Sequence, residues 1–376
     1  MTILFIISAL CLSFHPSLFP PAREHEIPIL VSPQVELFST IHRLAGTGQY
    51  DEHWLPAYTR EVEKRFTPFR KHRAVRLAVR LRGSHHLDGN SPMALASYLN
   101  EPPALRERAR LIPPPDDLDP RWTADSIPIA LDAAREFARD TDFMAFFQDH
   151  QPFYQKAVEN LRSTLRDTDI LTWFEKFFGY RAENYVIILG LQNGTCNYGQ
   201  SVTIPDGTRE FISILGARDP GPEGAPRYPE NWFIPIIVHE FCHSYINPIV
   251  DRNRERLKDA GRAIFPRLKD KLRERGYNFW HVMMYEYLVR ACTIRYLAAE
   301  KGAAAVHRQI SYDTRAGFPG IQKLSELLIE YEKQRDRYPD LDSFIPRIAD
   351  YFEDLSASLT NRAAPPAVPV KFDPGA

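Results

Sequence analysis

The chain has 376 residues, of which 44% are hydrophobic and 25% are charged, enough apolar material for a sizeable core in one or two lobes. Its 47 lysine and arginine residues nearly balance 48 aspartate and glutamate residues, which gives a formal net charge of −1. Because no overall positive charge attracts polyanions, the composition argues against nucleic-acid binding and against attachment to anionic membranes.

An apolar segment opens the chain. Residues 3–14 carry no charged side chain and are too few to span a bilayer, which is typical of the hydrophobic region of a secretory signal peptide. With cleavage near Ala22, residues 1–22 would be removed, and we expect export to the periplasm or the extracellular space. No lysine or arginine precedes the apolar segment, so a buried N-terminal strand or helix is the alternative.

The next part of the chain is mostly helical in pattern. Residues 34–46 and 52–66 are predicted helices, and helical patterns with many aromatic residues dominate 126–166. Ala74–Arg82 alternates apolar and basic residues, and this alternation predicts a strand with one solvated face. The basic run over 64–86 is interleaved with apolar residues, which favours a solvated face over a core and not a nucleic-acid site.

Strand patterns follow from Tyr185. The segments 185–191, 198–204 and 210–215 are predicted strands, and Asn193-Gly194 between the first two is a hairpin signal. Residues 220–229 form a loop rich in glycine and proline that could border a cleft. We therefore expect a small sheet whose edge strand can pair with an extended peptide.

The sequence over 236–248 contains the pattern His-Glu-x-x-His. On a helix, His239 and His243 share one face, close enough to bind one Zn²⁺, and Glu240 can reach a water at that metal. The neighbouring residues are uncharged, so the helix can be buried, and Pro248 is expected to stop or bend it. A buried helix with two hydrogen-bonded histidines is disfavoured because these polar groups are costly to bury without a partner.

A hydrolytic zinc site usually has a third protein ligand and a water in the fourth position. The metzincin pattern requires a glycine three residues after the second histidine and a further histidine three residues later. Ile246 and Ile249 occupy these positions, so that class is excluded. The remaining arrangement takes a glutamate from a second helix downstream, as in the thermolysin-like group.

Residues 277–299 supply such a glutamate. The stretch is compatible with a helix and mostly apolar, and Glu286 is the only acid in it, so Glu286 is the preferred third ligand. An ion pair with Arg290, four residues later, is the alternative, and both can hold if Arg290 orients the ligand. Asp251 and His281 are the weaker options for the third ligand.

Three cysteines would remain after removal of the signal peptide, and an odd number does not make a disulfide framework. They are Cys196, Cys242 and Cys292. The last two lie on the two helices expected to share the metal, and we expect buried thiols near one another without a bridge.

The segments His-Glu-Phe-Cys-His-Ser-Tyr-Ile-Asn-Pro (239–248) and Glu-Tyr-Leu-Val-Arg-Ala (286–291) carry a resemblance. They resemble an uncharacterised family of bacterial zincin-like proteins, known mainly as a domain of unknown function, and the likeness runs from about Val35 to Phe352. The resemblance implies a gluzincin-like peptidase and supplies no substrate. It also implies three metal ligands and one general base: His239, His243 and Glu286, with Glu240 as the base.

The predicted fold is α+β and mostly helical, with a zincin-like arrangement of a small mixed sheet over the His-Glu-x-x-His helix. One metallopeptidase domain would cover 23–362, with an N-terminal lobe to about 250 and a helical C-terminal lobe over 251–362. The proline-rich tail over 363–376 is low in complexity and is predicted to be disordered.

The predicted function is hydrolysis of peptide bonds with one Zn²⁺ per chain and Glu240 as general base. Tyr331 and Tyr338 are candidate donors to the oxyanion, with a place in the core as the favoured alternative for both. The expected partner is a peptide or protein substrate, without nucleic acid and without insertion in a membrane; nothing in the sequence indicates the oligomeric state. An inactive zinc-bound recognition protein and a metal-free helical binding protein are the two other functional classes.

Overall fold

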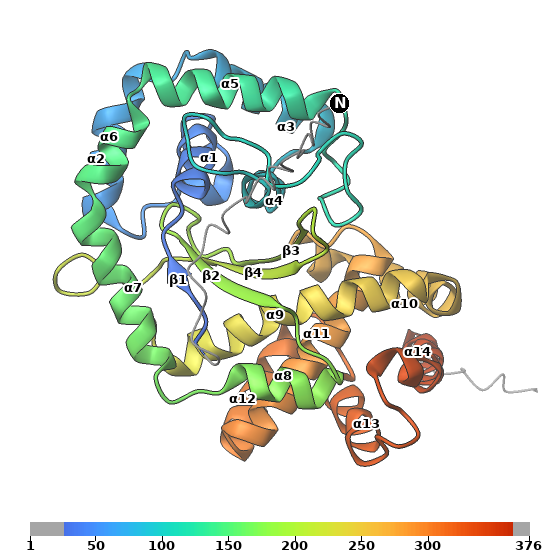
Figure 1. Ribbon diagram of the computed structural model, residues 1–376. Helices are drawn as coiled ribbons and strands as arrows, with labels where there is room; N and C mark the ends of the chain where they lie inside the picture. The colour runs from blue at the N-terminus through green and yellow to red at the C-terminus, as the bar shows by residue number, and fades with distance from the viewer. Residues whose placement is uncertain (1–25, 364–376) are drawn as a thin grey trace, which may run out of the picture.

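A four-stranded sheet lies between two groups of helices in the computed structural model, which describes residues 26–363 (Figure 1). The strands lie in the order β1-β2-β4-β3; β1 and β4 run parallel to β2, and β3 runs antiparallel to β4. This arrangement confirms the predicted α+β class and the small mixed sheet. The strand bounds are β1 (Ile29–Leu30), β2 (Asn184–Gly190), β3 (Tyr198–Thr203) and β4 (Arg209–Gly216).

All three strands predicted between 185 and 215 are present, but the predicted hairpin at Asn193-Gly194 is wrong. Since β4 lies between β2 and β3, the two residues belong to a longer connection and not to a two-residue turn. Helix α1 (Pro33–Leu44) holds this connection in place: Ser39 donates to Asn193 Oδ1 at 2.8 Å, and Glu36 accepts the Leu191 N–H at 2.7 Å. The true hairpin joins β3 to β4, with Thr203 opposite Arg209.

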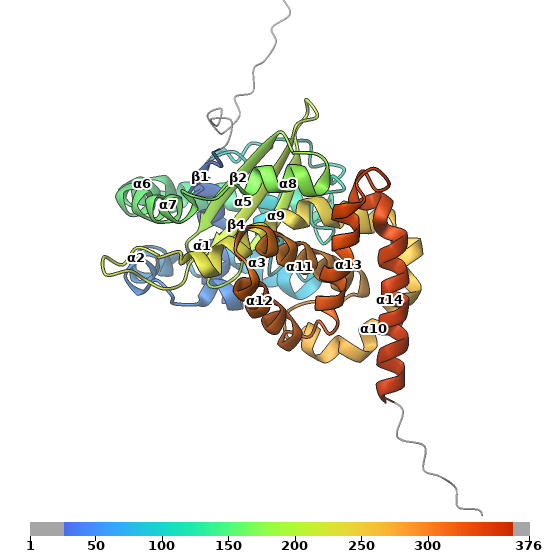
Figure 2. The same ribbon diagram turned by 90° about the horizontal axis from the view of Figure 1, so that it is seen from below.

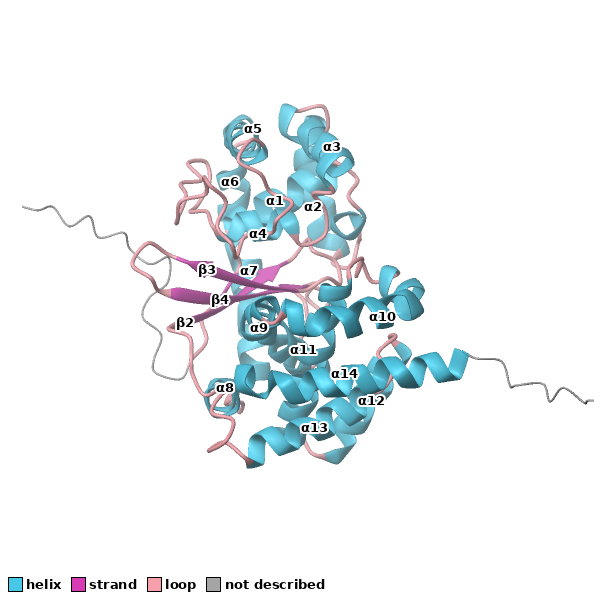
Figure 3. Ribbon diagram, turned by 90° about the vertical axis from the view of Figure 1, so that its right-hand side faces the viewer, coloured by secondary structure: helices cyan, strands magenta, loops and turns pink. Residues whose placement is uncertain are grey.

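The helices on one side of the sheet come from the first half of the chain (Figures 1 and 3). Every side chain of α1 is buried, so this helix forms the centre of that lobe. The other elements are α2 (Pro56–Phe66), α3 (Arg73–His85), α4 (Ser91–Ser97), α5 (Ser126–Asp140), α6 (Phe143–Asp149), α7 (Gln151–Leu165) and the 3₁₀ turns η1 (Gly48–Asp51) and η2 (Thr67–Phe69).

The predicted strand at 74–82 is wrong, because this segment lies within α3. Its buried residues follow a helical spacing and not an alternation, since Ala74 and Ala78 are buried together with Val75, Leu77 and Leu81. Val79, which a strand would have placed inside with its apolar neighbours, is 45% exposed. The buried alanines therefore show that the apolar residues of this segment follow the period of a helix and not that of a strand.

The second group of helices covers the other face of the sheet (Figure 3). Helix α9 lies directly below β3 and β4, and α11 packs beside α9. The more distant α13 and α14 pack on α11 and α10, away from the sheet (Figure 2). The bounds are α8 (Ile170–Phe178), α9 (Glu230–Arg252), α10 (Arg254–Arg273), α11 (Trp280–Glu300), α12 (Ala303–Arg315), α13 (Ile321–Lys333) and α14 (Leu341–Ala363).

Of the two outcomes predicted for Pro248, a stop or a bend, the stop is wrong: Pro248 does not end helix α9. The helix continues to Arg252 and also contains Pro235. An internal proline costs about 3 kcal/mol because it removes one helical hydrogen bond. The apolar residues on either side of Pro248, Ile246 and Ile249, are fully or almost fully buried, and their burial offsets this cost.

The predicted signal peptide over 1–22 and the predicted tail after Ala363 lie outside the described residues. Within them, Cys196, Cys242 and Cys292 are free thiols, as expected. None of the described helices combines the length and the apolar character that a bilayer span requires.

Candidate metal centre

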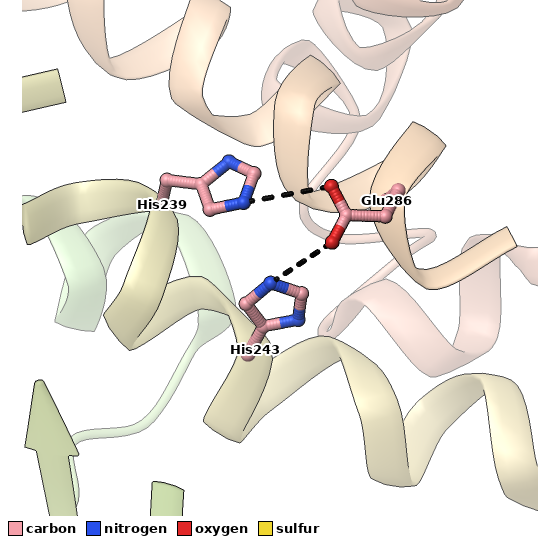
Figure 4. A group of neighbouring side chains, drawn as sticks. All are labelled: His239, His243 and Glu286. Carbon is pink, nitrogen blue, oxygen red and sulfur yellow. Dashed lines mark ion pairs between the residues drawn. The ribbon is translucent and has the colours of Figure 1, made fainter. Parts of the chain in front are cut away.

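The three predicted ligands lie together between two helices. His239 and His243 project from one face of α9, and Glu286 reaches toward both from α11 (Figure 4). His239 Nε2 lies 3.6 Å from Glu286 Oε2, and His243 Nε2 lies 3.4 Å from Glu286 Oε1. The structure therefore brings together one nitrogen from each imidazole and the carboxylate, all within 4.8 Å of one another.

The spacing of these donor atoms fits a small divalent cation. Two atoms bound tetrahedrally to Zn²⁺ lie about 3.3–3.4 Å apart when each bond is about 2.0–2.1 Å long. The two nitrogen–oxygen distances, 3.4 and 3.6 Å, are close to that separation. Two imidazoles with one carboxylate are also the donor set of hydrolytic zinc sites. The side chains of His239 and His243 are 16% and 15% exposed, so the donors remain within reach of solvent.

Glu286 is held by a cation on its own helix. Arg290 Nη2 lies 2.9 Å from Glu286 Oε2, which confirms the predicted pair across one helical turn. Burial alone would raise the pKa of Glu286, but the Arg290 guanidinium and the two imidazoles outweigh it and lower that pKa. The carboxylate is therefore charged and ready to accept a cation at any ordinary pH.

Arg290 is itself fixed from three directions. Its Nη1 donates to Asp313 Oδ1 of α12 at 2.6 Å, and its Nη2 donates to the hydroxyl of Tyr277 at 3.2 Å. The guanidinium lies 4.4 Å from the centre of the Phe318 ring, and its Nε has no hydrogen-bond partner among the described residues. Because Asp313 is fully buried, the Arg290 guanidinium lies between two buried carboxylates, those of Glu286 and Asp313.

The ring orientation of His243 is also fixed. Its Nδ1 lies 3.1 Å from Asn247 Oδ1, one turn further along α9. An amide oxygen can only accept, so Nδ1 carries a proton, and Nε2, which faces Glu286, is the ring nitrogen left to bind a metal. Burial lowers the pKa of His239 well below its usual value, whereas Glu286 outweighs burial and raises the pKa of His243.

Glu240 lies beside the three candidate ligands, next to strand β3, and is 7% exposed. Burial raises the pKa of its carboxyl to about 7, partly opposed by His243 and by the backbone N–H of Gly199. Gly199 on β3 approaches α9 so closely that a Cβ there would lie 2.0 Å from the Glu240 carbonyl oxygen. Only glycine allows the strand to lie this close to Glu240.

The weaker options for the third ligand do not join this group. The Asp251 carboxylate pairs with Arg254 and accepts a hydrogen bond from Tyr285. The ring of His281 stacks on Phe279, with 5.5 Å between the centroids.

Neither tyrosine proposed as an oxyanion donor reaches the candidate metal ligands. Tyr331 donates to the carbonyl of Phe177, and Tyr338 packs on Phe344. The sequence reasoning missed Tyr277 instead, which hydrogen-bonds Arg290 and Glu286 from the loop before α11. A loop tyrosine has no periodicity that could have marked it.

A second group with metal-binding side chains lies on the other lobe: His72, Glu136 and Asp140. His72 Nδ1 accepts the backbone N–H of Ala74 at 3.1 Å, so its proton is on Nε2, which faces Asp140 at 3.2 Å. Glu136 pairs with Arg73 at 2.9 Å. Both ring nitrogens are therefore engaged, and this group is a helix cap and not a ligand set.

A match to a known family covers the candidate metal centre. Residues 125–350 match the family described as a domain of unknown function (DUF4932), and this region begins well after Val35, where the resemblance was expected to start. No curated protein and no solved structure matches the chain. Because the match extends over more than half of the sequence and includes His239, His243, Glu286 and Arg290, the chain belongs to the DUF4932 family.

Proposed function

We propose that the protein is a zinc-dependent peptidase whose metal ligands are His239, His243 and Glu286. The observation that carries the proposal is the convergence of the two Nε2 atoms on the two oxygens of Glu286, at 3.6 and 3.4 Å. Arg290 supports it, since a cation that fixes a ligating carboxylate keeps the ligand oriented in the absence of metal. When bound, Zn²⁺ supplies a Lewis acid that polarises a water and a carbonyl oxygen.

Glu240 is the proposed general base. Its carboxylate takes a proton from the attacking water and passes that proton to the amine that leaves the scissile bond. A group that must both accept and release a proton works best with a pKa near the pH of the solution, and burial raises that of Glu240 to about 7. The Gly199 N–H holds the carboxylate on the side of β3.

An extended peptide is the proposed substrate. Strand β3 is the edge of the sheet, with β4 on one side and no strand on the other among the described residues. The backbone of an edge strand can pair with an extended chain, so substrates would be recognised first through their main chain. Because β3 passes directly over Glu240 at Gly199, a peptide on that edge would cross the metal ligands.

Elemental analysis of purified protein is the first test. About one zinc per chain is expected, with none in the His239→Ala/His243→Ala double variant and at least tenfold weaker binding in Glu286→Ala. Full zinc occupancy in the double variant would show that His239 and His243 are not the metal ligands. The pair between Glu286 and Arg290 gives a metal-free binding protein a physical basis, because the carboxylate is already compensated; that function predicts no stoichiometric zinc.

Digestion of denatured proteins or of a peptide library is the second test. Cleavage by the zinc-bound wild type that is lost in Glu240→Gln supports a peptidase. Zinc-bound protein that retains peptides without cleaving them would instead be an inactive recognition protein.

A further inference from the structure

An exposed tryptophan lies on the same face of α9 as the metal ligands. Trp232 precedes His239 by seven residues, or two helical turns, so its side chain points the same way about 10 Å along the helix. Trp232 is 53% exposed, although Phe233 and Ile234, which follow it on the helix, are buried in the core. An aromatic ring left in solvent beside a reactive site is available to a ligand.

The positively charged side chain of Arg218 lies over the Trp232 ring. Arg218 follows the end of β4, and its guanidinium lies 5.0 Å from the centre of the Trp232 ring. Among residues 26–363, no hydrogen bond or ion pair engages Arg218. The nearest acids in sequence to the two residues are already paired, Asp219 with Arg227 and Glu230 with Lys301.

The direction of a bound peptide can be inferred from β3 and α9, which run in the same direction. Gly199 lies over Glu240, and the next residue, Gln200, accepts a hydrogen bond from Ser244, one turn later on the helix. A peptide paired antiparallel to β3, the commoner arrangement, would run the opposite way. Its residues after the scissile bond would therefore extend toward the beginning of α9, where Trp232 and Arg218 lie.

We propose that Arg218, braced on Trp232, binds a carboxylate of the substrate two or three residues after the scissile bond. The inference rests on the proposed peptidase function. The distance of about 10 Å between the two helix positions corresponds to about three residues of extended peptide at 3.3 Å each. A guanidinium presents two parallel N–H donors to a carboxylate, and the ring restricts its motion before the ligand arrives. The carboxylate is either the C-terminus of the peptide or an aspartate or glutamate side chain.

Two peptide libraries separate these sources. One library of random octapeptides carries free C-terminal carboxylates, and the other is the same library with C-terminal amides. With zinc-loaded wild type, a C-terminal anchor predicts di- and tripeptide products from the free-acid library, at least about tenfold more than from the amides. A side-chain anchor predicts aspartate and glutamate enriched two or three residues after the cut in both libraries.

Variants of Arg218 and Trp232 test whether these residues cause the preference for a substrate carboxylate, whichever of the two sources it has. Arg218→Gln should reduce it about tenfold, Arg218→Lys should keep part of it, and Trp232→Ala should weaken it because the guanidinium is no longer braced. Arg227→Gln, in the same loop but paired with Asp219, is the matched control and should change nothing. Cleavage without a preference for carboxylates, or with the preference on the N-terminal side of the cut, overturns the inference and leaves the peptidase function standing.

A binding measurement keeps the two proposals apart. The zinc-loaded Glu240→Gln protein is dialysed against both libraries, and the retained peptides are identified by mass spectrometry. A carboxylate preference among them that Arg218→Gln removes supports the anchor even if no peptide is ever cleaved by wild type. Retention without such a preference overturns the anchor, whatever the outcome for catalysis.

Discussion

Arg290 Nη2 lies 2.9 Å from the carboxylate of Glu286, while Nη1 of the same guanidinium lies 2.6 Å from Asp313. The Arg290 guanidinium thus pairs with a buried carboxylate on α11 and with another on α12. It connects Glu286, the proposed ligand, to α12, a helix that contributes no proposed ligand. In a pocket where these three side chains are at most 7% exposed, neither carboxylate has water as an alternative partner.

Removal of this guanidinium should weaken zinc binding and lower the stability of the fold. Arg290→Gln leaves Glu286 and Asp313 buried without a cation, which typically costs about 3–5 kcal/mol of stability. We expect zinc affinity to fall about 10–100-fold, because the ligand is no longer oriented. Chelator competition measures the affinity and urea unfolding the stability. Arg290→Lys should recover part of both, and unchanged zinc affinity in the glutamine variant would show that Arg290 does not position Glu286.

Replacement of Tyr277 by phenylalanine tests the second contact to this pair. The change removes a hydroxyl that accepts from Arg290 and bonds Glu286, so zinc should bind a few-fold more weakly, with a stability loss of about 1 kcal/mol. Tyr331→Phe is the matched control, since it also removes a buried hydroxyl, here bonded to the Phe177 carbonyl. Equal zinc affinities in the two variants would argue against a role for Tyr277 at the metal.

Glu240→Gln should separate catalysis from metal binding. The amide keeps the size of the side chain but cannot accept a proton, so cleavage should fall about 10²–10⁴-fold, the usual contribution of a general base. Zinc content and thermal midpoint should stay near those of wild type. Loss of zinc in this variant would make Glu240 a ligand or a structural support, and full activity would place the base elsewhere.

Gly199→Ala should disrupt the contact between β3 and α9. The added Cβ would lie 2.0 Å from the Glu240 carbonyl oxygen and 3.0 Å from His243 Cβ, so strand and helix must separate. We expect lower stability and weaker zinc binding. Gly83→Ala is the control: its Cβ would meet nothing within 4 Å, and alanine in a helix should stabilise by about 0.5–1 kcal/mol. A Gly199→Ala protein with unchanged stability and zinc affinity would show that the close approach is not needed.

His42 should make the fold sensitive to mild acid. Burial, with a smaller effect of Arg82, lowers its pKa to about 3, well below the unfolded value near 6.5. The stabilising effect of the neutral ring is therefore complete above pH 6.5 and is lost as the pH falls toward 3. This group alone contributes a slope of up to about 1.4 kcal/mol per pH unit in that window.

Urea unfolding at pH 7, 6 and 5 measures this slope. His42→Gln should flatten it, whereas the same change at the exposed His85 should not. The same slope in the His42 variant and in wild type would mean that other groups cause the acid sensitivity.

Local sequence patterns were sufficient to pick out the proposed metal ligands as a group but not to predict the residues that surround them. The spacing of His239 and His243 and the lone acid at Glu286 are visible in the sequence, because each depends on one helix at a time. The contacts of Arg290 with Asp313 and Tyr277 depend on how α11, α12 and a loop pack, and no periodicity encodes that.

The two errors in the fold have a similar cause. Asn193-Gly194 carries the chemistry of a tight turn, but contacts with α1, more than 150 positions earlier, decide the path of the chain there. The segment 74–82 shows both an alternating and a helical pattern, and the packing of Ala74 and Ala78 against the core selects the helix. In both places tertiary contacts outweigh a valid local signal.

The burial of α1 has a consequence for how the chain can be divided. The recognised family region begins at 125, yet β1 pairs with β2, and Glu36 of α1 accepts a hydrogen bond from Leu191 at 2.7 Å. A fragment limited to 125–350 would expose the apolar surface that α1 covers and would leave the edge of β2 unpaired, a template for aggregation. During synthesis, α1 must likewise wait for some 150 further residues before it can be enclosed. Slow maturation and dependence on chaperones are the expected result of so distant a pairing.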